Sequence, residues 1–288
     1  MNLVIYMKFK KYNNIKDFCE ENLELLLEKE WLNNLIVGNC FDALENGGEE
    51  DWILANVSND GKTELIILYR KPWKVLLYTP TDNFSKELYE FAANEMYKID
   101  RNLIGVNTDY RAAELFAKEY TKLSGKEYKI LFPMRILLLE KINEGKLLEN
   151  ASLRELNDND KELAIDWIDK FYKEALNEIH DREKLEEKYE NYKERGYYFL
   201  EIDGKVVSQA IFARKLKYGK SISYVYTPEN QRGKGYAYNC VYLLTKKTME
   251  EGAKYCVLYT DDSNPISNHV YEKIGYKRKS DQLDIAFL

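Results

Sequence analysis

Residues 225–237 read VYTPENQRGKGYA and join two stretches of different pattern. The stretch that runs into them, Lys220–Thr227, is rich in β-branched and aromatic residues, which predicts a strand. The stretch after them has the apolar spacing of a helix. Gly233 and Gly235 lack a Cβ atom, so the backbone between strand and helix can curl tightly. Main-chain N–H groups at the start of a helix favour anions, so the segment predicts a loop that binds a pyrophosphate group.

The residues around the two glycines narrow the choice of ligand. Arg232 and Lys234 add positive charge at the mouth of the predicted loop. The loop lacks the G-x-x-x-x-G-K-[ST] pattern, which disfavours nucleotide hydrolysis. It also lacks the third glycine and the βαβ setting of a dinucleotide fingerprint. Taken alone, the segment also fits an ordinary glycine-containing turn with basic residues, and a second motif decides between the two interpretations.

The second motif lies one predicted strand further along the chain. Residues 264–276 read NPISNHVYEKIGY and follow the strand predicted for Tyr255–Thr260. The combination of Q-R-G-K-G-Y-A with N-P-x-S-N-x-x-Y-x-K-I-G-Y, in this order and context, resembles the GNAT superfamily of N-acetyltransferases. The resemblance covers the chain from near Ala151 to Leu288, and it implies a GNAT domain in the C-terminal half.

The resemblance also implies which residues hold acetyl-CoA, the co-substrate of the family. The glycine loop would donate main-chain N–H groups to the pyrophosphate, and the preceding strand would pair with the pantetheine arm. Asn264 would bind the pantetheine, and Tyr271 would protonate the departing thiolate. The set implied for the coenzyme is Val225, Tyr226, Thr227, Gln231, Arg232, Gly233, Lys234, Gly235, Tyr236, Ala237, Asn264, Ser267 and Asn268.

The chemistry of acyl transfer gives a separate argument for catalytic roles. Transfer from a thioester passes through an oxyanion, which a main-chain N–H near the end of Ser221–Thr227 can stabilise. A tyrosine hydroxyl can be the acid for the leaving thiolate, although Tyr271 also fits a plain core aromatic residue. Glu174 is the predicted proton acceptor for the amine, with Glu178 and Tyr224 as alternatives. An exposed or packing role is open for each of the three.

The first half of the chain repeats the order of elements in the second. Both halves predict helices, three strands with hairpin turns, and then helix, strand, helix and strand. Tyr78-Thr79-Pro80 and Tyr226-Thr227-Pro228 each end the third of these strands. We therefore expect a tandem duplication with domains at 1–148 and 149–288, rather than two unrelated α/β domains. Each domain is expected to be an α/β fold, with a mixed, mostly antiparallel sheet flanked by helices.

The first half lacks the glycine loop. Counting from the shared Tyr-Thr-Pro, Ser85 and Glu87 stand where Gly233 and Gly235 stand. A glutamate at the pyrophosphate position would repel the coenzyme. The sequence therefore predicts a degenerate GNAT-like N-terminal domain without a coenzyme site.

Bulk composition excludes several classes of protein. A net charge of -6, with basic and acidic residues interspersed over 288 residues, predicts no nucleic-acid partner. No apolar run approaches the roughly 20 residues of a membrane helix, and the start fits no signal peptide. Four cysteines in apolar contexts, two histidines and no C-x-x-C pair predict a reduced cytoplasmic protein without a metal site.

These patterns together predict an enzyme that transfers the acetyl group of acetyl-CoA directly to an amine of a small molecule or peptide. Two alternatives are a non-catalytic acyl-CoA-binding sensor or assembly module, and an acyltransferase for a longer acyl-CoA. Cys240 is expected to be buried rather than nucleophilic. The protein is expected to be a monomer or homodimer. An acidic group that could attract a cationic amine, or simply form a solvated helix face, comprises Glu174, Glu178, Asp181 and Glu183.

Overall fold

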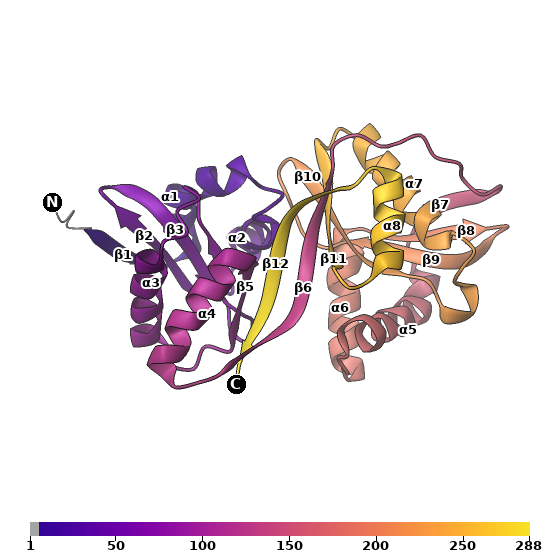
Figure 1. Cartoon of the computed structure of the whole chain (residues 1–288). Coiled ribbons are helices and arrows are strands. Elements are labelled where there is room, and N and C mark those ends of the chain that lie inside the picture. The colour runs from indigo at the N-terminus through magenta and orange to yellow at the C-terminus, as the bar shows by residue number, and fades with distance from the viewer. Residues whose placement is uncertain (1–5) are drawn as a thin grey trace. The chain divides into compact units, whose positions relative to one another are not determined.

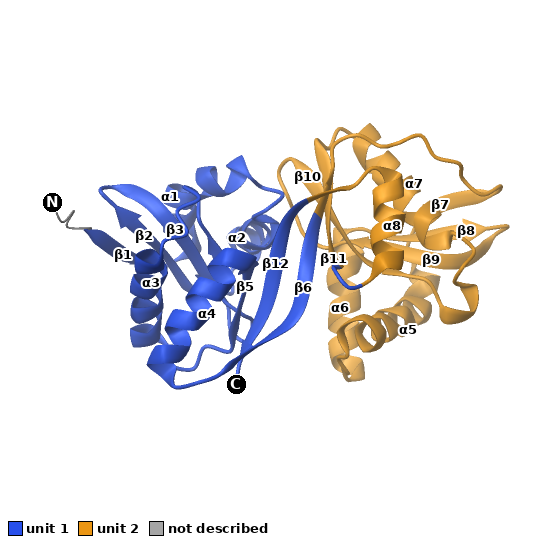
Figure 2. Ribbon diagram, in the orientation of Figure 1, with its two compact units in different colours: residues 1–136, 261–263, 279–288 blue, residues 137–260, 264–278 orange. Residues whose placement is uncertain are grey.

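The computed structural model describes residues 6–288, which divide into two compact units (Figure 2). Unit 1 contains the chain up to Ile136 together with Asp261–Ser263 and Lys279–Leu288. Unit 2 contains Leu137–Thr260 and Asn264–Arg278. Each unit has its own hydrophobic core, so each is described separately.

Unit 1 opens with a four-stranded antiparallel sheet in the order β1-β2-β3-β4. Asp60 and Gly61 form the turn between β2 and β3 with φ values of 48° and 78°, which suit a tight hairpin. The elements of the unit (Figure 1) are β1 (Met7–Tyr12), α1 (Ile15–Glu28), α2 (Asn34–Asn46), β2 (Ile53–Asn59), β3 (Lys62–Tyr69), β4 (Leu76–Tyr78), α3 (Lys86–Ile99), β5 (Gly105–Asp109), α4 (Tyr110–Ser124) and most of β6 (Tyr128–Leu139).

The last strand of the chain completes unit 1. This strand, β12 (Lys277–Phe287), pairs antiparallel with β5. Ile285 and Phe287 are buried among the side chains of α3 and α4. Gly105 lies so close to β12 that a Cβ atom there would come within 2.0 Å of Ile285 O. The C-terminal residues are therefore part of the core of unit 1.

Unit 2 is a sheet in the order β11-β10-β9-β8-β7 with helices on both faces. Strands β10 and β11 are parallel, and the other neighbours are antiparallel. Helices α5 and α6 pack on one face, and α7 and α8 pack on the other. The elements, after the end of β6, are β7 (Ala151–Glu155), η1 (Asp158–Asp160), α5 (Lys161–Phe171), η2 (Tyr172–Leu176), α6 (Arg182–Arg195), β8 (Tyr197–Ile202), β9 (Lys205–Phe212), β10 (Gly219–Tyr226), η3 (Glu229–Gln231), α7 (Tyr236–Glu250), β11 (Tyr255–Asp261) and α8 (Pro265–Ile274).

The fold class predicted from the sequence is confirmed. Both halves run β-α-α-β-β-β-α-β-α-β in chain order. Strand β7 was not predicted, because its five residues follow a polar segment and none of them is buried. The apolar spacing of Asp160–Asn177 predicts a single helix. In the structure α5 ends at Phe171 and continues as the π-helical turn η2. The pattern of Leu3–Lys10 predicts the first strand, of which Leu3–Ile5 lies outside the described residues.

The compact units do not coincide with the predicted division of the chain. The sequence placed the boundary between 148 and 149, whereas the units change at Ile136 and Leu137. The sequence also assigned the last strand to the C-terminal half, whereas Lys279–Leu288 belongs to unit 1. The division into functional domains at 1–148 and 149–288 stays a prediction.

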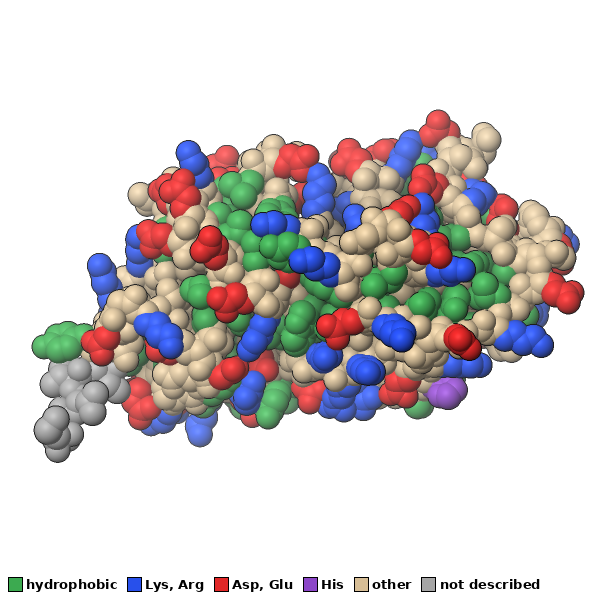
Figure 3. All heavy atoms as spheres, turned by 90° about the horizontal axis from the view of Figure 1, so that it is seen from above, with side chains coloured by type: hydrophobic (Ala, Val, Ile, Leu, Met, Phe, Trp, Pro, Cys, Tyr) green, Lys and Arg blue, Asp and Glu red, His purple; other side chains and the backbone are tan. Residues whose placement is uncertain are grey.

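The described surface carries charge of both signs. On the face drawn in Figure 3, basic and acidic side chains are interspersed. That face therefore lacks a broad patch of one sign of the kind that attracts a polyanion. Among residues 6–288, no helix is both long enough and apolar enough to cross a bilayer.

Candidate active site

An open strand edge lies between β10 and β11 in unit 2. The two strands pair only where Gly219–Ser221 runs beside Tyr255–Val257. Further along β10, the register with β9 shifts between Ser223 and Tyr226, and Tyr224 has a φ of 50°. A shift of this kind is a β-bulge, which bends the strand and increases its twist. The end of β10 therefore leaves β11 and offers main-chain groups to an extended ligand.

The glycine loop follows this edge and opens α7. Gly233 and Gly235 have φ values of 77° and 80°. A Cβ atom on Gly233 would meet nothing within 4 Å, and one on Gly235 only Asn239 Nδ2 at 3.7 Å. Backbone conformation, rather than lack of space, therefore requires glycine at both positions. Among the described residues no side chain caps the N-terminus of α7, so its first N–H groups can bind an anion.

Two side chains brace the loop. Asn239 is buried, and its Nδ2 donates to Gly235 O across 2.8 Å. Its Oδ1 accepts from Leu148 N at 2.9 Å, so one amide fixes the start of α7 against the segment before β7. Lys234 Nζ donates to Gln231 Oε1 at 3.0 Å. Sequence reasoning missed Asn239, because a buried asparagine one turn into a helix has no pattern of its own.

Arg232 and Glu174, predicted separately, form an ion pair in the structure. Arg232 Nε also donates to Thr227 O across 2.9 Å. The other carboxylate oxygen of Glu174 accepts from Tyr226 Oη at 3.1 Å. Burial and the neighbouring Glu174 raise the pKa of Tyr226 to about 12. The pair links the glycine loop to η2, and both side chains remain more than 40% exposed, so an incoming anion can compete for Arg232.

Helix α8 holds the residues of the second motif. Asn264 is its N-cap, and Oδ1 of Asn264 accepts from Ser267 N at 3.1 Å. Asn268 is buried. Tyr271 is 8% exposed and packs edge-on against Tyr276. Burial raises the pKa of Tyr271 to about 12, while a hydrogen bond with Ser267 lowers it.

A hollow of about 400 Å³ lies beside the glycine loop. A basic and an aromatic side chain of the loop, Lys234 and Tyr236, line it on one side. Leu148, Glu149 and Ile202 line the remainder. A planar base can stack on an aromatic ring, and a phosphate can pair with a lysine, so the hollow is chemically suited to a nucleotide.

Three tyrosine hydroxyls and one lysine amine lie close together on the face of the unit 2 sheet that α5, η2 and α6 cover. Tyr172 Oη lies 2.8 Å from both Tyr192 Oη and Tyr224 Oη. Lys188 Nζ donates to Tyr172 Oη across 2.9 Å and lies 4.2 Å from the centre of that ring. We call these four residues the tyrosine–lysine cluster. Sequence reasoning singled out only Tyr224, because the other members are far apart in the chain and belong to no motif.

Unit 2 contains two of the four cysteines, Cys240 and Cys256, and both histidines. Cys240 is fully buried, and burial raises the pKa of its thiol to about 12. This agrees with the prediction of a buried cysteine and does not suit a nucleophile. His269 is exposed, and His180 packs on the Tyr172 ring at 4.6 Å. Within residues 6–288, no three His, Cys, Asp or Glu side chains are grouped to hold a metal ion.

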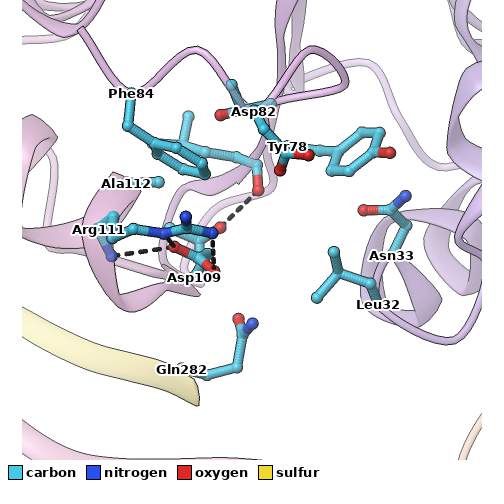
Figure 4. Close-up of a pocket in the computed structure, with 12 residues that line it drawn as sticks. Leu32, Asn33, Tyr78, Asp82, Phe84, Asp109, Arg111, Ala112 and Gln282 are labelled. Carbon is cyan, nitrogen blue, oxygen red and sulfur yellow. Dashed lines mark hydrogen bonds and ion pairs between the residues drawn. The ribbon is translucent and has the colours of Figure 1, made fainter. Parts of the chain in front are cut away.

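In unit 1, the place that corresponds to the open strand edge of unit 2 is closed (Figure 4). A pocket of only about 40 Å³ remains at the ends of β4 and β5. Arg111 lies 3.8 Å from the centre of the Phe84 ring and pairs with Asp109. Thr108 Oγ1 donates to Leu77 O across 2.5 Å and so ties β5 to β4. Strand β4 pairs with β3 without a register shift, so the bulge that opens unit 2 is missing here.

Comparison with known families identifies the C-terminal part of the chain. Residues 161–276 match the model of the acetyltransferase (GNAT) family. The match spans α5 to α8 and therefore contains the open strand edge, the glycine loop and the second motif. The match identifies a GNAT domain within residues 161–276. None of the curated proteins compared with the chain matches it.

Solved structures extend the likeness to the whole chain. A GCN5-related N-acetyltransferase from Sphaerobacter thermophilus has a TM-score of 0.64 and 12% identity, over 98% of this chain and 95% of that one. A GNAT-family acetyltransferase from Colwellia psychrerythraea has a TM-score of 0.60 and 13% identity, over 97% and 98%. A tandem GNAT protein from the clavulanic acid biosynthesis pathway has a TM-score of 0.56 and 11% identity, over 98% of both chains. The chain as a whole has the tandem GNAT fold.

Proposed function

We propose that the protein is an N-acetyltransferase that uses acetyl-CoA to acetylate an amine of a small molecule or peptide. The main support is one observation, the uncapped N-terminus of α7 behind two glycines at positive φ. This arrangement is suited to a pyrophosphate group. The open edge of β10 beside it is suited to an extended pantetheine arm. The family match of residues 161–276 agrees with both.

The residues proposed to hold the coenzyme fall into three groups. The β10 edge, Val225–Thr227, would pair with the pantetheine arm. The loop from Gln231 to Ala237 would bind the pyrophosphate, and Lys234 and Tyr236 would also line a nucleotide pocket in the hollow beside it. Asn264, Ser267 and Asn268 on α8 would contact the pantetheine from the other side. Acetyl-CoA supplies the activated acyl group when bound, and a metal is not part of the proposal.

The chain's own groups would perform three tasks in the reaction. A main-chain N–H at the bulge around Tyr224 would stabilise the oxyanion of the tetrahedral intermediate. Tyr271 would donate a proton to the departing sulfur, which its raised pKa permits because the hydroxyl keeps its proton at neutral pH. A proton acceptor must take the proton that the ammonium group of the acceptor loses. Glu174 is the acceptor proposed from the sequence.

Unit 1 would have no coenzyme of its own. Its counterpart pocket is far below the roughly 300 Å³ of a typical ligand site, and Ser85 caps α3 where unit 2 has an open glycine turn. We therefore propose one coenzyme site for each chain, in a cytoplasmic monomer or homodimer.

Calorimetry with acetyl-CoA tests the coenzyme site. The wild type should bind one acetyl-CoA per chain, and Gly235→Glu should abolish binding through charge repulsion and backbone strain. Gly125→Glu is the matched control, because Gly125 has a φ of 70° and equally open space but lies in unit 1. Each substitution costs about 1–3 kcal/mol of strain, so equal loss of binding in both variants would contradict the proposed site.

A thiol-release screen then tests the reaction. Acetyl-CoA is offered with amino acids, polyamines, aminoglycosides and peptides, and at least one amine should raise the release of free coenzyme above hydrolysis. Binding without turnover on any amine would favour the non-catalytic sensor. If a longer acyl-CoA, offered together with acetyl-CoA, is turned over faster, an acyltransferase for a longer acyl-CoA would be favoured.

A further inference from the structure

The hydrogen bonds of Tyr172 allow a proton to rest at two places in the tyrosine–lysine cluster. A tyrosine hydroxyl has one donor and two acceptor sites, and Tyr172 Oη has three polar neighbours. When Lys188 is protonated, it donates to Tyr172, which donates to one tyrosine and accepts from the other. When Lys188 is neutral, Tyr172 donates to Nζ and accepts from both. Every site is filled in each state, so the proton can shift without movement of heavier atoms.

We propose that Tyr224, Tyr172 and Lys188 form a relay that removes the proton from the acceptor amine before it attacks the thioester, a role that rests on the proposed function. Tyr224 is the entry, because its main chain forms the bulge at the open strand edge and its side chain is only half-buried. Tyr172 is the bridge and is 4% exposed. Lys188 is the end of the relay, on α6, and is 9% exposed. Tyr192 is a side branch that bonds the bridge and also interacts with Tyr224, and the path from Tyr224 through Tyr172 to Lys188 does not include it.

The proton balance of the relay is simple. The ammonium group gives a proton to Tyr224 Oη as Tyr224 gives its own proton to Tyr172 Oη. Tyr172 in turn gives its proton to the neutral Lys188 Nζ, so each oxygen breaks one O–H bond and forms another. The net change is a neutral acceptor amine and a protonated Lys188. The second proton, lost when the amide forms, restores the hydroxyl of Tyr271 after that hydroxyl has protonated the departing sulfur in the proposed reaction.

The surroundings of Lys188 favour its neutral form. Burial lowers the pKa of Lys188, and the nearby Lys184 lowers it further. Glu178 and Glu187 act in the opposite direction on the pKa of Lys188. Burial also raises the pKa of Tyr172, so the bridge passes protons as a neutral hydroxyl. The charged and titratable groups that face the cluster are Lys184, Glu187 and Arg195 on α6, Glu178 and His180 in the segment before α6, and Arg214 after β9.

Two amines of similar size separate proton removal from other effects. Benzylamine is protonated at neutral pH and needs a proton acceptor, whereas aniline is already neutral. Tyr172→Phe and Lys188→Met should lower kcat/KM for benzylamine at neutral pH by about 10²-fold or more, the range of general base catalysis. The same variants should leave kcat/KM for aniline little changed. Equal losses with both amines would mean a packing role and would overturn the relay.

Two matched variants serve as controls. Tyr192→Phe removes the same hydroxyl from a ring in the same cluster but leaves the path from Tyr224 to Lys188 intact, so the benzylamine rate should persist. Lys193→Met removes an exposed lysine from the same helix and should also leave the rate unchanged. If Glu174→Gln, and not Tyr172→Phe, shows the selective loss with benzylamine, Glu174 is the proton acceptor and the relay is wrong.

Direct titration gives a readout that does not depend on turnover. In protein with ¹³C-labelled lysine, the ε-carbon of Lys188 should titrate at a lower pH than that of Lys193. A Lys188 that titrates together with Lys193 would overturn the relay, since its amine would then be charged and unable to accept a proton. Wild-type protein that fails to bind acetyl-CoA, or that acetylates none of the screened amines, would instead contradict the proposed function. A wild type that acetylates benzylamine only as fast as Tyr172→Phe does would contradict the relay alone.

Discussion

Burial places the Tyr271 ring in the core and also keeps its hydroxyl protonated. The side chain lies between α8 and the sheet, and loss of solvent raises its pKa to about 12. A phenol with this pKa remains protonated across neutral and mildly alkaline pH. Tyr271 therefore keeps the proton that the proposed reaction requires over this pH range, and it is a core aromatic residue at the same time.

Tyr271→Phe separates these two functions. We expect kcat to fall by about 10²-fold while affinity for acetyl-CoA stays unchanged, because only the hydroxyl is lost. Since the wild-type hydroxyl keeps its proton until close to pH 12, the ratio of wild-type kcat to variant kcat should be constant from neutral to mildly alkaline pH. Thiol release measures kcat, and calorimetry measures the affinity for acetyl-CoA. Tyr276→Phe is the control, because that hydroxyl bonds Thr245 inside the core; unchanged turnover in Tyr271→Phe would remove the acid role.

At the scale of elements, local patterns gave the helices and strands, but pairing across the chain did not follow from them. The asparagine-aspartate-glycine turn at Asp60 and the glycine at Gly275 end their elements where local chemistry predicts. The bulge at Tyr224 was not predictable, since it depends on how β10 leaves β11. The same holds for the partner of β12, because a strand pattern specifies a buried face and not its neighbour.

Strand β12 contributes measurably to the stability of unit 1. Ile285 is fully buried in that core, so Ile285→Ala should lower the free energy of unfolding by about 2–5 kcal/mol. Ile266→Ala removes the same atoms from a side chain that is 79% exposed, and it should change the free energy of unfolding little. Urea unfolding of both variants measures the difference. Equal effects would mean that β12 is not part of the core in solution.

The candidate site was predicted only in part, because contacts between residues far apart in the chain do not follow from local patterns. Gly233 and Gly235 were found because their role is set by local backbone geometry. Glu174 was expected as a free base, but its ion pair with Arg232 joins residues 58 positions apart and leaves no trace in the sequence. Lys188 and Tyr172 could have been noticed only as polar residues on the apolar faces of their helices.

At the scale of the whole molecule, the many tyrosines make stability sensitive to alkaline pH. The chain has 24 tyrosines, and burial raises the pKa of several in both units, among them Tyr89, Tyr197 and Tyr276. In the unfolded chain these groups ionise near their ordinary value of about 10. Above that pH the unfolded state binds fewer protons than the folded state, so stability falls as pH rises.

We therefore expect the urea midpoint to decrease between about pH 9 and pH 11, around the ordinary tyrosine value. Below about pH 9 these tyrosines are protonated in both states and contribute no slope. Tyrosinate absorbance, followed in the same samples, should rise together with unfolding for the buried groups. Complete ionisation of the tyrosines in a chain that is still folded would contradict this expectation.

The assignment of residues 279–288 to unit 1 has a consequence for the order in which the protein is made. Unit 2 has all of its residues once synthesis has passed Arg278. Unit 1 contains earlier residues than unit 2, but it lacks Ile285 and Phe287 until those positions have been translated. On the ribosome, the part of unit 1 that emerges first must wait with an unfilled core and with the β12 edge of β5 unpaired, while unit 2 can close before it.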